Sequence, residues 1–113
     1  MQIPKALIEG TQLTNINSTY YTATNVRTRI DKCTLCNTTG GAITVTLDIV
    51  VAAGTAGVTQ RVMSARSIGA GETYPCFSEL VGHWLNPGDS IQGLASAATS
   101  ITLRASGVEV SGI

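Results

Sequence analysis

Two apolar stretches meet at a tight turn in Trp84-Leu85-Asn86-Pro87-Gly88-Asp89-Ser90-Ile91. Proline fixes φ near the value that the second position of a turn requires, and the glycine after it supplies the positive φ that a type II turn needs next. An extended pattern then resumes at Ser90. The stretch predicts a β-strand, a tight turn and a second β-strand, and it points to no reaction.

The rest of the chain repeats this alternation of short extended runs and turns. The clearest run is 42–51, where apolar and polar residues alternate as in a strand with one buried face. The predicted buried face consists of Ile43, Val45, Leu47, Ile49 and Val51. Further strands are expected at 18–24, 26–37, 60–68, 73–78, 90–95 and 100–109.

Irregular positions are expected at three places along these strands. A bulge near Asp31 would turn Ile30 and Leu35 to the same side of the strand at 26–37. Thr38-Thr39-Gly40-Gly41 is typical of a hairpin turn, and Gly107 is expected to mark a second bulge. About eight or nine strands and no helix result, which fits a β-sandwich, a jelly roll or a small barrel.

Length and composition narrow the class of protein. A chain of 113 residues favours a single domain. Charged residues make up only 12% and the formal net charge is zero, which argues against nucleic acid as a partner. The sequence has no secretory signal pattern and no apolar run long enough to span a membrane. Three cysteines indicate free thiols and a reducing site of synthesis.

Residues 1–10 are expected to form an N-terminal arm, followed by a β-sandwich domain over residues 11–113. The arm contains apolar Ile3, Leu7 and Ile8, but Pro4 and Gly10 interrupt any regular element. Two arrangements remain open from the sequence: the arm is the first strand of the sheet, or it lies on a neighbouring subunit.

No cluster of reactive side chains predicts catalysis or a cofactor. Cys33-x-x-Cys36, Cys76 and His83 offer zinc-ligand residue types, but two cysteines three apart in one strand point to opposite faces. His83 is the single histidine and no Gly-x-Ser-x-Gly motif accompanies it. The carboxylates are scattered, and Gly69-x-Gly71 lacks the context of a phosphate loop. We therefore predict no catalytic residue, no metal and no cofactor.

Adhesive residues are the remaining functional candidates. Adjacent tyrosines in a strand place one ring outward, where it can anchor an interface, and basic residues two apart share a face that can meet an acidic protein surface. The predicted interface residues are Ile3, Leu7, Ile8, Tyr20, Tyr21, Arg27, Arg29 and Trp84.

The order of these motifs resembles that of small structural proteins of tailed-bacteriophage virions, most closely the capsid decoration, or cement, proteins. The resemblance covers about residues 18–110, and its motifs are turn sequences shared by several phage head and tail proteins. It is carried by residues 21–30, 33–39 and 43–47, by Ala70-Gly71-Glu72-Thr73, by Leu85-Asn86-Pro87-Gly88-Asp89-Ser90-Ile91, and by residues 105–110.

The resemblance implies an all-β, jelly-roll-like antiparallel sandwich that binds without catalysing a reaction. Such a protein would form a dimer or trimer, bind the major capsid protein on the outer surface of the phage head, and stabilise the capsid lattice. It would be made in the bacterial cytoplasm and reside in the virion, with neither nucleic acid nor a membrane as partner. A phage tail or fibre component, or a small carbohydrate-binding module, are the alternative functions.

Overall fold

The computed structural model of the chain describes residues 2–75 and 80–111. Short strands follow one another through these ranges, with a single 3-10 turn, η1, between the fourth and fifth strands. The elements are β1 (Gln2–Gln12), β2 (Ser18–Thr22), β3 (Arg27–Asn37), β4 (Ile43–Val50), η1 (Val58–Gln60), β5 (Arg61–Ile68), β6 (Thr73–Tyr74), β7 (Trp84–Leu85), β8 (Ser90–Ala95) and β9 (Ile101–Val110). Residues 76–78 of the strand expected at 73–78 lie outside the described ranges.

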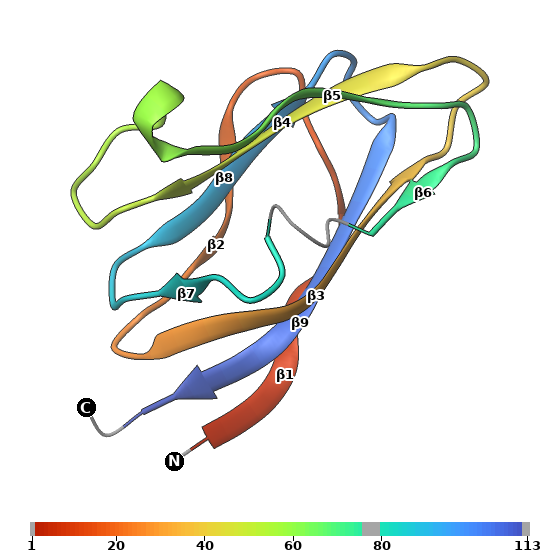
Figure 1. The fold of residues 1–113 in the computed structure, drawn as a ribbon. Coiled ribbons are helices and arrows are strands. Elements are labelled where there is room, and N and C mark those ends of the chain that lie inside the picture. The colour runs from red at the N-terminus through yellow and green to blue at the C-terminus, as the bar shows by residue number, and fades with distance from the viewer. Residues whose placement is uncertain (1, 76–79, 112–113) are drawn as a thin grey trace.

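The strands form two antiparallel sheets that pack face to face (Figure 1). One sheet has the order β1-β9-β3-β6, with β7 also paired to β3, and the other has the order β2-β8-β4-β5. The short strands β6 and β7 pair with opposite ends of β3, so they act as two pieces of one strand. If β6 and β7 are counted together as the sixth strand, β8 becomes the seventh strand and β9 the eighth. The strand orders of the two sheets are then 1-8-3-6 and 2-7-4-5. This is a jelly roll of eight strands, which confirms the predicted fold class.

The core lies between the sheets and is built from large aliphatic side chains. The largest of those with essentially no exposed surface are Leu13, Ile30, Leu35, Leu47, Ile68, Leu80, Leu85, Ile91, Ile101 and Leu103. Val45 and Leu47 are buried as expected, but Val51 is 53% exposed. The prediction for Val51 is wrong because β4 ends at Val50, and the chain then turns with Gly54 N donating to Val51 O.

The N-terminal residues take the first of the two arrangements left open by the sequence. Residues 2–12 form β1, which pairs along β9 from Gln2–Val110 to Gln12–Thr102. The strand runs through Gly10, so the structure has no boundary between residues 10 and 11. A register shift between Ala6 and Ile8 lets the neighbouring side chains of Leu7 and Ile8 both reach the core.

Of the three irregular positions, only the bulge near Asp31 is confirmed. The β3–β9 register shifts between Ile30 and Lys32, and Ile30 and Leu35 are both fully buried. Gly107 is wrong as a bulge because β9 continues regularly through it. An added Cβ there would lie 2.0 Å from Arg29 O, so the glycine permits a close approach of the two strands.

The hairpin expected at 38–41 is also wrong, because β3 and β4 belong to different sheets. The buried side chain of Asn37 ties this crossing from one sheet to the other. Its Nδ2 donates to Gly41 O at 2.8 Å and to Ile68 O at 2.9 Å, while its Oδ1 accepts from Thr39 N. A local sequence rich in threonine and glycine indicates a turn, but not which sheet follows it.

The turn at 86–89 has the geometry that its sequence predicts. Gly88 has φ of 93°, and Asp89 N donates to Asn86 O at 2.9 Å. The carboxylate of Asp89 accepts from Asn86 N and from Ala52 N, each at 3.0 Å. Asp89 therefore joins this turn to the loop that follows β4.

Candidate interaction surface

Two of the eight predicted interface residues face the core, and two more pack against it. Leu7 and Ile8 are 8% and 4% exposed, so they face the core instead of an open surface. Tyr20 and Tyr21 are partly buried and pack against that core. The Tyr20 hydroxyl accepts a hydrogen bond from Thr14 N at 3.1 Å, which fixes the ring against the chain that enters β2.

Tyr21 belongs to a polar network that links the two sheets. Its hydroxyl donates to Glu109 Oε2 and shares a hydrogen bond of 2.8 Å with Thr28 Oγ1. The other oxygen of Glu109 lies 3.4 Å from Lys5 Nζ. Burial and the neighbouring carboxylate raise the pKa of Tyr21 to about 12. Tyr21 therefore acts as a clamp between β2 and the opposite sheet.

Arg27, Arg29 and Trp84 lie close together on the outer face of the β1-β9-β3-β6 sheet, where β7 pairs with β3. Arg29 is the cross-strand partner of Trp84, and its guanidinium lies 5.7 Å from the centre of the indole ring. Arg29 Nε also donates to Asp31 Oδ1 at 2.7 Å, which raises the pKa of the guanidinium. A hollow of about 260 Å³ lies between Arg27, Trp84 and Asn86. This group is the part of the predicted interface that the fold assembles.

Ile3 is 44% exposed but does not join this group. Its cross-strand partner is Glu109, whereas Arg27 pairs with the next residue, Val110. Since successive residues of a strand point to opposite faces, Ile3 and Arg27 lie on opposite sides of the sheet.

Two further cations lie on the outer face that carries Arg27: Lys32, which its position on the same strand as Arg27 and Arg29 predicts, and Arg104, which no sequence pattern indicates. Lys32 pairs with Ser106, and Arg104 pairs with Thr34, so the two cations are diagonal neighbours across β3 and β9. They flank a shallow hollow of about 280 Å³, whose walls also include Ala6 and Ser106. Only strand pairing places Arg104 beside Lys32, because the two residues are far apart in the sequence.

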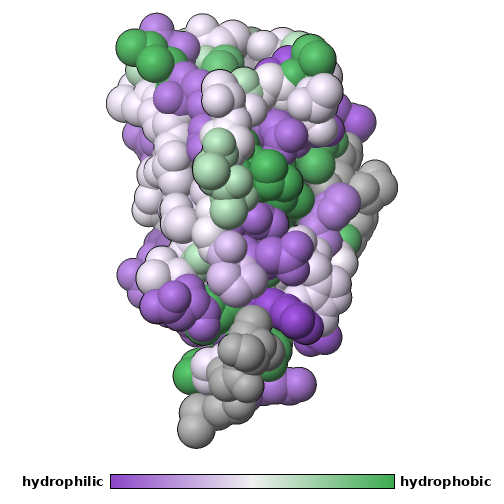
Figure 2. Space-filling view, turned by 90° about the vertical axis from the view of Figure 1, so that its left-hand side faces the viewer, coloured by the Kyte–Doolittle hydropathy of each residue, from purple (hydrophilic) through white to green (hydrophobic). Residues whose placement is uncertain are grey.

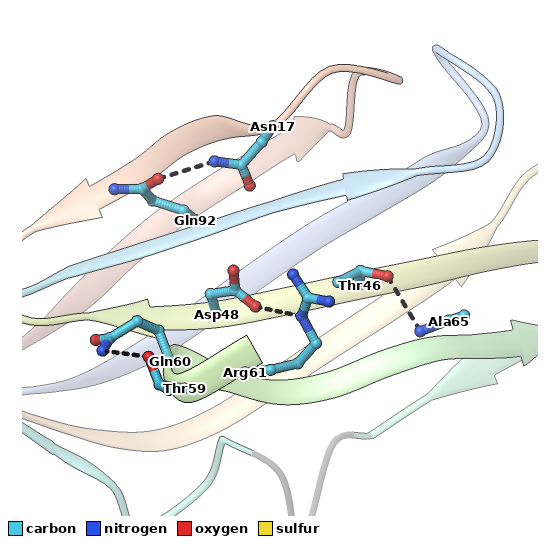
Figure 3. Close-up of polar contacts among 8 residues, drawn as sticks. All are labelled: Asn17, Thr46, Asp48, Thr59, Gln60, Arg61, Ala65 and Gln92. Atoms are coloured by element: carbon cyan, nitrogen blue, oxygen red, sulfur yellow. Dashed lines mark hydrogen bonds and ion pairs between the residues drawn. The ribbon is translucent and has the colours of Figure 1, made fainter. Parts of the chain in front are cut away.

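A further polar hollow, of about 410 Å³, lies on the outer face of the β2-β8-β4-β5 sheet. Figure 3 shows four of the polar side chains that line it, namely Asn17, Asp48, Arg61 and Gln92. Asp48 is 1% exposed and accepts a hydrogen bond from Arg61 Nε at 3.0 Å, which raises the pKa of that guanidinium. Across the sheet, Asn17 Nδ2 donates to Gln92 Oε1 at 2.9 Å. Residues 54–56 of the loop after β4 form a further wall. Donors and acceptors thus stand side by side, an arrangement that suits a ligand rich in hydroxyl groups.

Apolar surface is dispersed. Figure 2 shows small green patches separated by hydrophilic residues on the face that it presents. The large exposed hydrophobic side chains of the described residues are Ile3, Ile16, Val51, Val58 and Trp84. Within residues 2–75 and 80–111, no three His, Cys, Asp or Glu side chains are grouped so that they could hold a metal ion. In the same ranges, no helix has the length and apolar character needed to cross a membrane.

Comparisons with known proteins bear on the fold. No family model and no curated protein matches the sequence. A chain in the solved "Structure of infectious bursal disease virus Gx strain" is similar over 99% of this chain, with a TM-score of 0.52 and 14% sequence identity. The match covers 32% of that chain, so the present sequence spans about a third of its length. At this identity the likeness establishes a shared β-sandwich fold.

Proposed function

We propose that this chain is a structural protein of a virus particle, and that it decorates the outer surface of a tailed-phage head. In this role it binds neighbouring major capsid subunits as a dimer or trimer and stabilises the lattice by binding alone. The observation that carries the proposal is the jelly-roll strand order, which extends from β1 to β9 and resembles a domain-sized part of a chain in a virus structure.

The available surfaces support an adhesive role. The hollows at Lys32 and Arg104, at Trp84 and at Asp48 are open depressions on sheet faces, and polar side chains line each of them. Such surfaces suit shallow contacts with another protein. On a repeating lattice, many weak contacts of this kind add up to strong total binding.

The test is binding of the purified chain to phage heads that lack it. We expect the chain to sediment with the heads, to appear at regular positions on their outer surface in cryo-electron microscopy, and to raise their thermal disruption temperature. Isolated tails from the same phage serve as the comparison. Binding to tails with no binding to heads would move the proposal to a tail or fibre component, and binding to neither would refute it.

A carbohydrate-binding module is the second candidate, and the hollow beside Asp48 favours it. Arg61 has further N–H groups beyond the one bound to Asp48, and Asn17 and Gln92 contribute amide groups nearby. A glycan array with the wild-type chain tests this function. Hits that vanish in Asn17→Ala and persist in the distant Arg27→Ala variant would support it, and an array without hits would reject it.

A further inference from the structure

The zero net charge of the sequence conceals an uneven distribution of charge between interior and surface. Asp48 and Asp89 are 1% and 7% exposed, and the side chain of Glu109 is 16% exposed. Each is engaged within the fold: Asp48 by Arg61, Asp89 by backbone N–H groups, and Glu109 by Lys5 and the Tyr21 hydroxyl. Three acidic side chains are thus withdrawn from the surface, while most of the basic ones stay on it.

Exposed cations gather on the outer face of the β1-β9-β3 sheet. Arg27, Lys32 and Arg104 are exposed, and Arg29 is half-buried beside Trp84. Cross-strand pairing fixes their common face, since Lys32 lies opposite Ser106 and Arg104 lies opposite Thr34. Among the described residues of this face, the carboxylates are Glu9 and Asp31. The face therefore carries a positive charge although the whole chain is neutral.

We infer that this face, defined by Arg27, Arg29, Lys32, Trp84 and Arg104, docks on an acidic protein surface. The inference rests on the proposed function and names the side of the sandwich that faces the partner. Trp84 is 50% exposed and is held by Arg29, so a large ring is presented with little loss of side-chain freedom on binding. Tryptophan and arginine are the residue types that most often dominate protein interfaces.

Charge and shape favour a protein partner over a nucleic acid. Asp31 forms an ion pair with Arg29 in the middle of the face, and Glu9 lies opposite Arg104 in the β1–β9 register. These carboxylates would repel a continuous line of phosphates, whereas a protein surface of mixed charge can place cations beside them. The hollow between Lys32 and Arg104 has room for a carboxylate side chain.

The single tryptophan of the chain lies on this face and reports on its occupancy. The probe is a deca-glutamate peptide, titrated at low ionic strength while Trp84 fluorescence is recorded. We expect a saturable change that weakens as salt is added. The double variant Arg27→Glu/Lys32→Glu should bind the peptide roughly tenfold more weakly, because two exposed cations become repulsive.

Arg66→Glu is the matched control, because Arg66 is an exposed arginine stacked on Tyr74 at the β5–β6 edge of the sandwich. It should change peptide affinity less than about twofold. Unaltered fluorescence in the wild-type titration, equal losses in the double and control variants, or tighter binding of a ten-residue oligothymidylate would each overturn the inference. Arg27→Gln/Lys32→Gln replaces the double variant if charge reversal impairs folding, as judged by circular dichroism.

Phage heads separate a failure of this inference from a failure of the proposed function. If the wild type binds to heads, the double variant binds more weakly and Arg66→Glu binds as the wild type does, both the docking face and the proposed function are supported. Equal binding of wild type and double variant to heads refutes the docking face and leaves the proposed function standing. Peptide binding that depends on this face, without head binding by the wild type, refutes the proposed function and supports the surface chemistry.

Discussion

Tyr21, Thr28 and Glu109 show how individual polar residues hold the two sheets together. Thr28 is fully buried on β3, Glu109 is mostly buried on β9, and Tyr21 reaches both from β2 in the other sheet. A buried carboxylate needs hydrogen-bond donors, and the Tyr21 hydroxyl and Lys5 supply them. The adjacent tyrosines suggested a ring for an interface, but tertiary contacts give Tyr21 an internal role.

We expect alkaline pH to weaken the hydrogen bonds that the Tyr21 hydroxyl makes with Glu109 and Thr28. The pKa of Tyr21 is about 12 in the folded chain and 10 as the reference value, so the folded state holds the proton more tightly. The resulting stabilisation is complete below pH 10 and disappears as the pH rises towards 12. We expect the free energy of unfolding to fall over this window in wild type, and to fall less in Tyr21→Phe.

Urea unfolding at pH 9 and pH 11, followed by circular dichroism, measures the effect. Tyr20→Phe serves as the control because its hydroxyl bonds to Thr14 N on the exposed side of the chain. Identical pH dependence in wild type and Tyr21→Phe would contradict the prediction.

At the scale of the element, the β3–β9 pair depends on one glycine for its spacing. Opposite the bulge of β3, Gly107 allows the carbonyl of Arg29 to come closer than any side chain would permit. Leu7 of β1 also lies near this position, with its Cδ1 3.1 Å from where a Cβ would stand. Strands β1, β3 and β9 therefore pack closely at Gly107 because this residue has no side chain.

Gly107→Ala should destabilise the fold by about 2–3 kcal/mol, because backbone atoms must move to admit the methyl group. Gly40→Ala is the matched control, since no atom lies within 4 Å of its added Cβ. That variant should change stability by less than about 0.5 kcal/mol. Chemical denaturation of both variants tests the prediction, and similar midpoints would count against the close approach.

The two halves of β1 differ in burial, so we expect truncations of different length to affect stability differently. Residues 2–6 are exposed, whereas Leu7 and Ile8 lie in the core. Removing residues 1–6 should leave a folded sandwich. Removing residues 1–12 should cost several kcal/mol, since burial of each aliphatic side chain contributes about 1.5–3 kcal/mol and an edge strand is lost.

Thermal unfolding followed by circular dichroism distinguishes the two truncations. A cooperative transition in both, with similar midpoints, would mean that β1 is dispensable as an element of the sandwich. Loss of the transition only in the longer truncation is the expected result.

For the whole molecule, the jelly roll joins segments that are distant in the sequence. Gln2 pairs with Val110, Ser18 with Gly93, and Val45 with Ala95. Such contacts require closure of long loops before any stabilisation is gained, which slows folding. Sheet topology therefore determines the kinetics of this chain more than its local turns do.

We expect refolding from urea in roughly milliseconds to seconds, as for other β-sandwiches. Stopped-flow recording of Trp84 fluorescence is suitable because β7 must pair with β3 to bring Arg29 to the ring. Recovery of the full signal within microseconds would contradict this expectation.

Local features were predicted best where one short stretch contains the whole cause. Pro87 and Gly88 specify their turn without help from the rest of the chain, and the opposite parity of Ile30 and Leu35 demands a bulge. The prediction for Val51 failed because alternation does not mark where a strand ends. The hairpin at 38–41 failed because turn residues look alike whether the chain returns to its own sheet or crosses to the other.

The interface residues divide in the same way. Alternation on one strand placed Arg27 and Arg29 together, as the structure has them. The sequence could not show that Arg104 lies on the same face as Arg27 and Arg29, because the register between β3 and β9 places it there. In the same way, only the register between β4 and β8 places Gln92 beside Asp48. The burial of both Leu7 and Ile8 depends on a bulge in β1, and no residue type in this strand predicts that bulge.

The amino-acid sequence was enough to predict an all-β domain, a type II turn at residues 86–89 and a bulge in the third strand. Those features follow from backbone preferences and from the period of apolar residues, which act over a few neighbours. The folded structure was needed to establish the strand order, the burial of Asp48, Asp89 and Glu109, and the face on which the exposed cations lie. These depend on which strands pair and in which register, and that is settled by burial of the whole core at once.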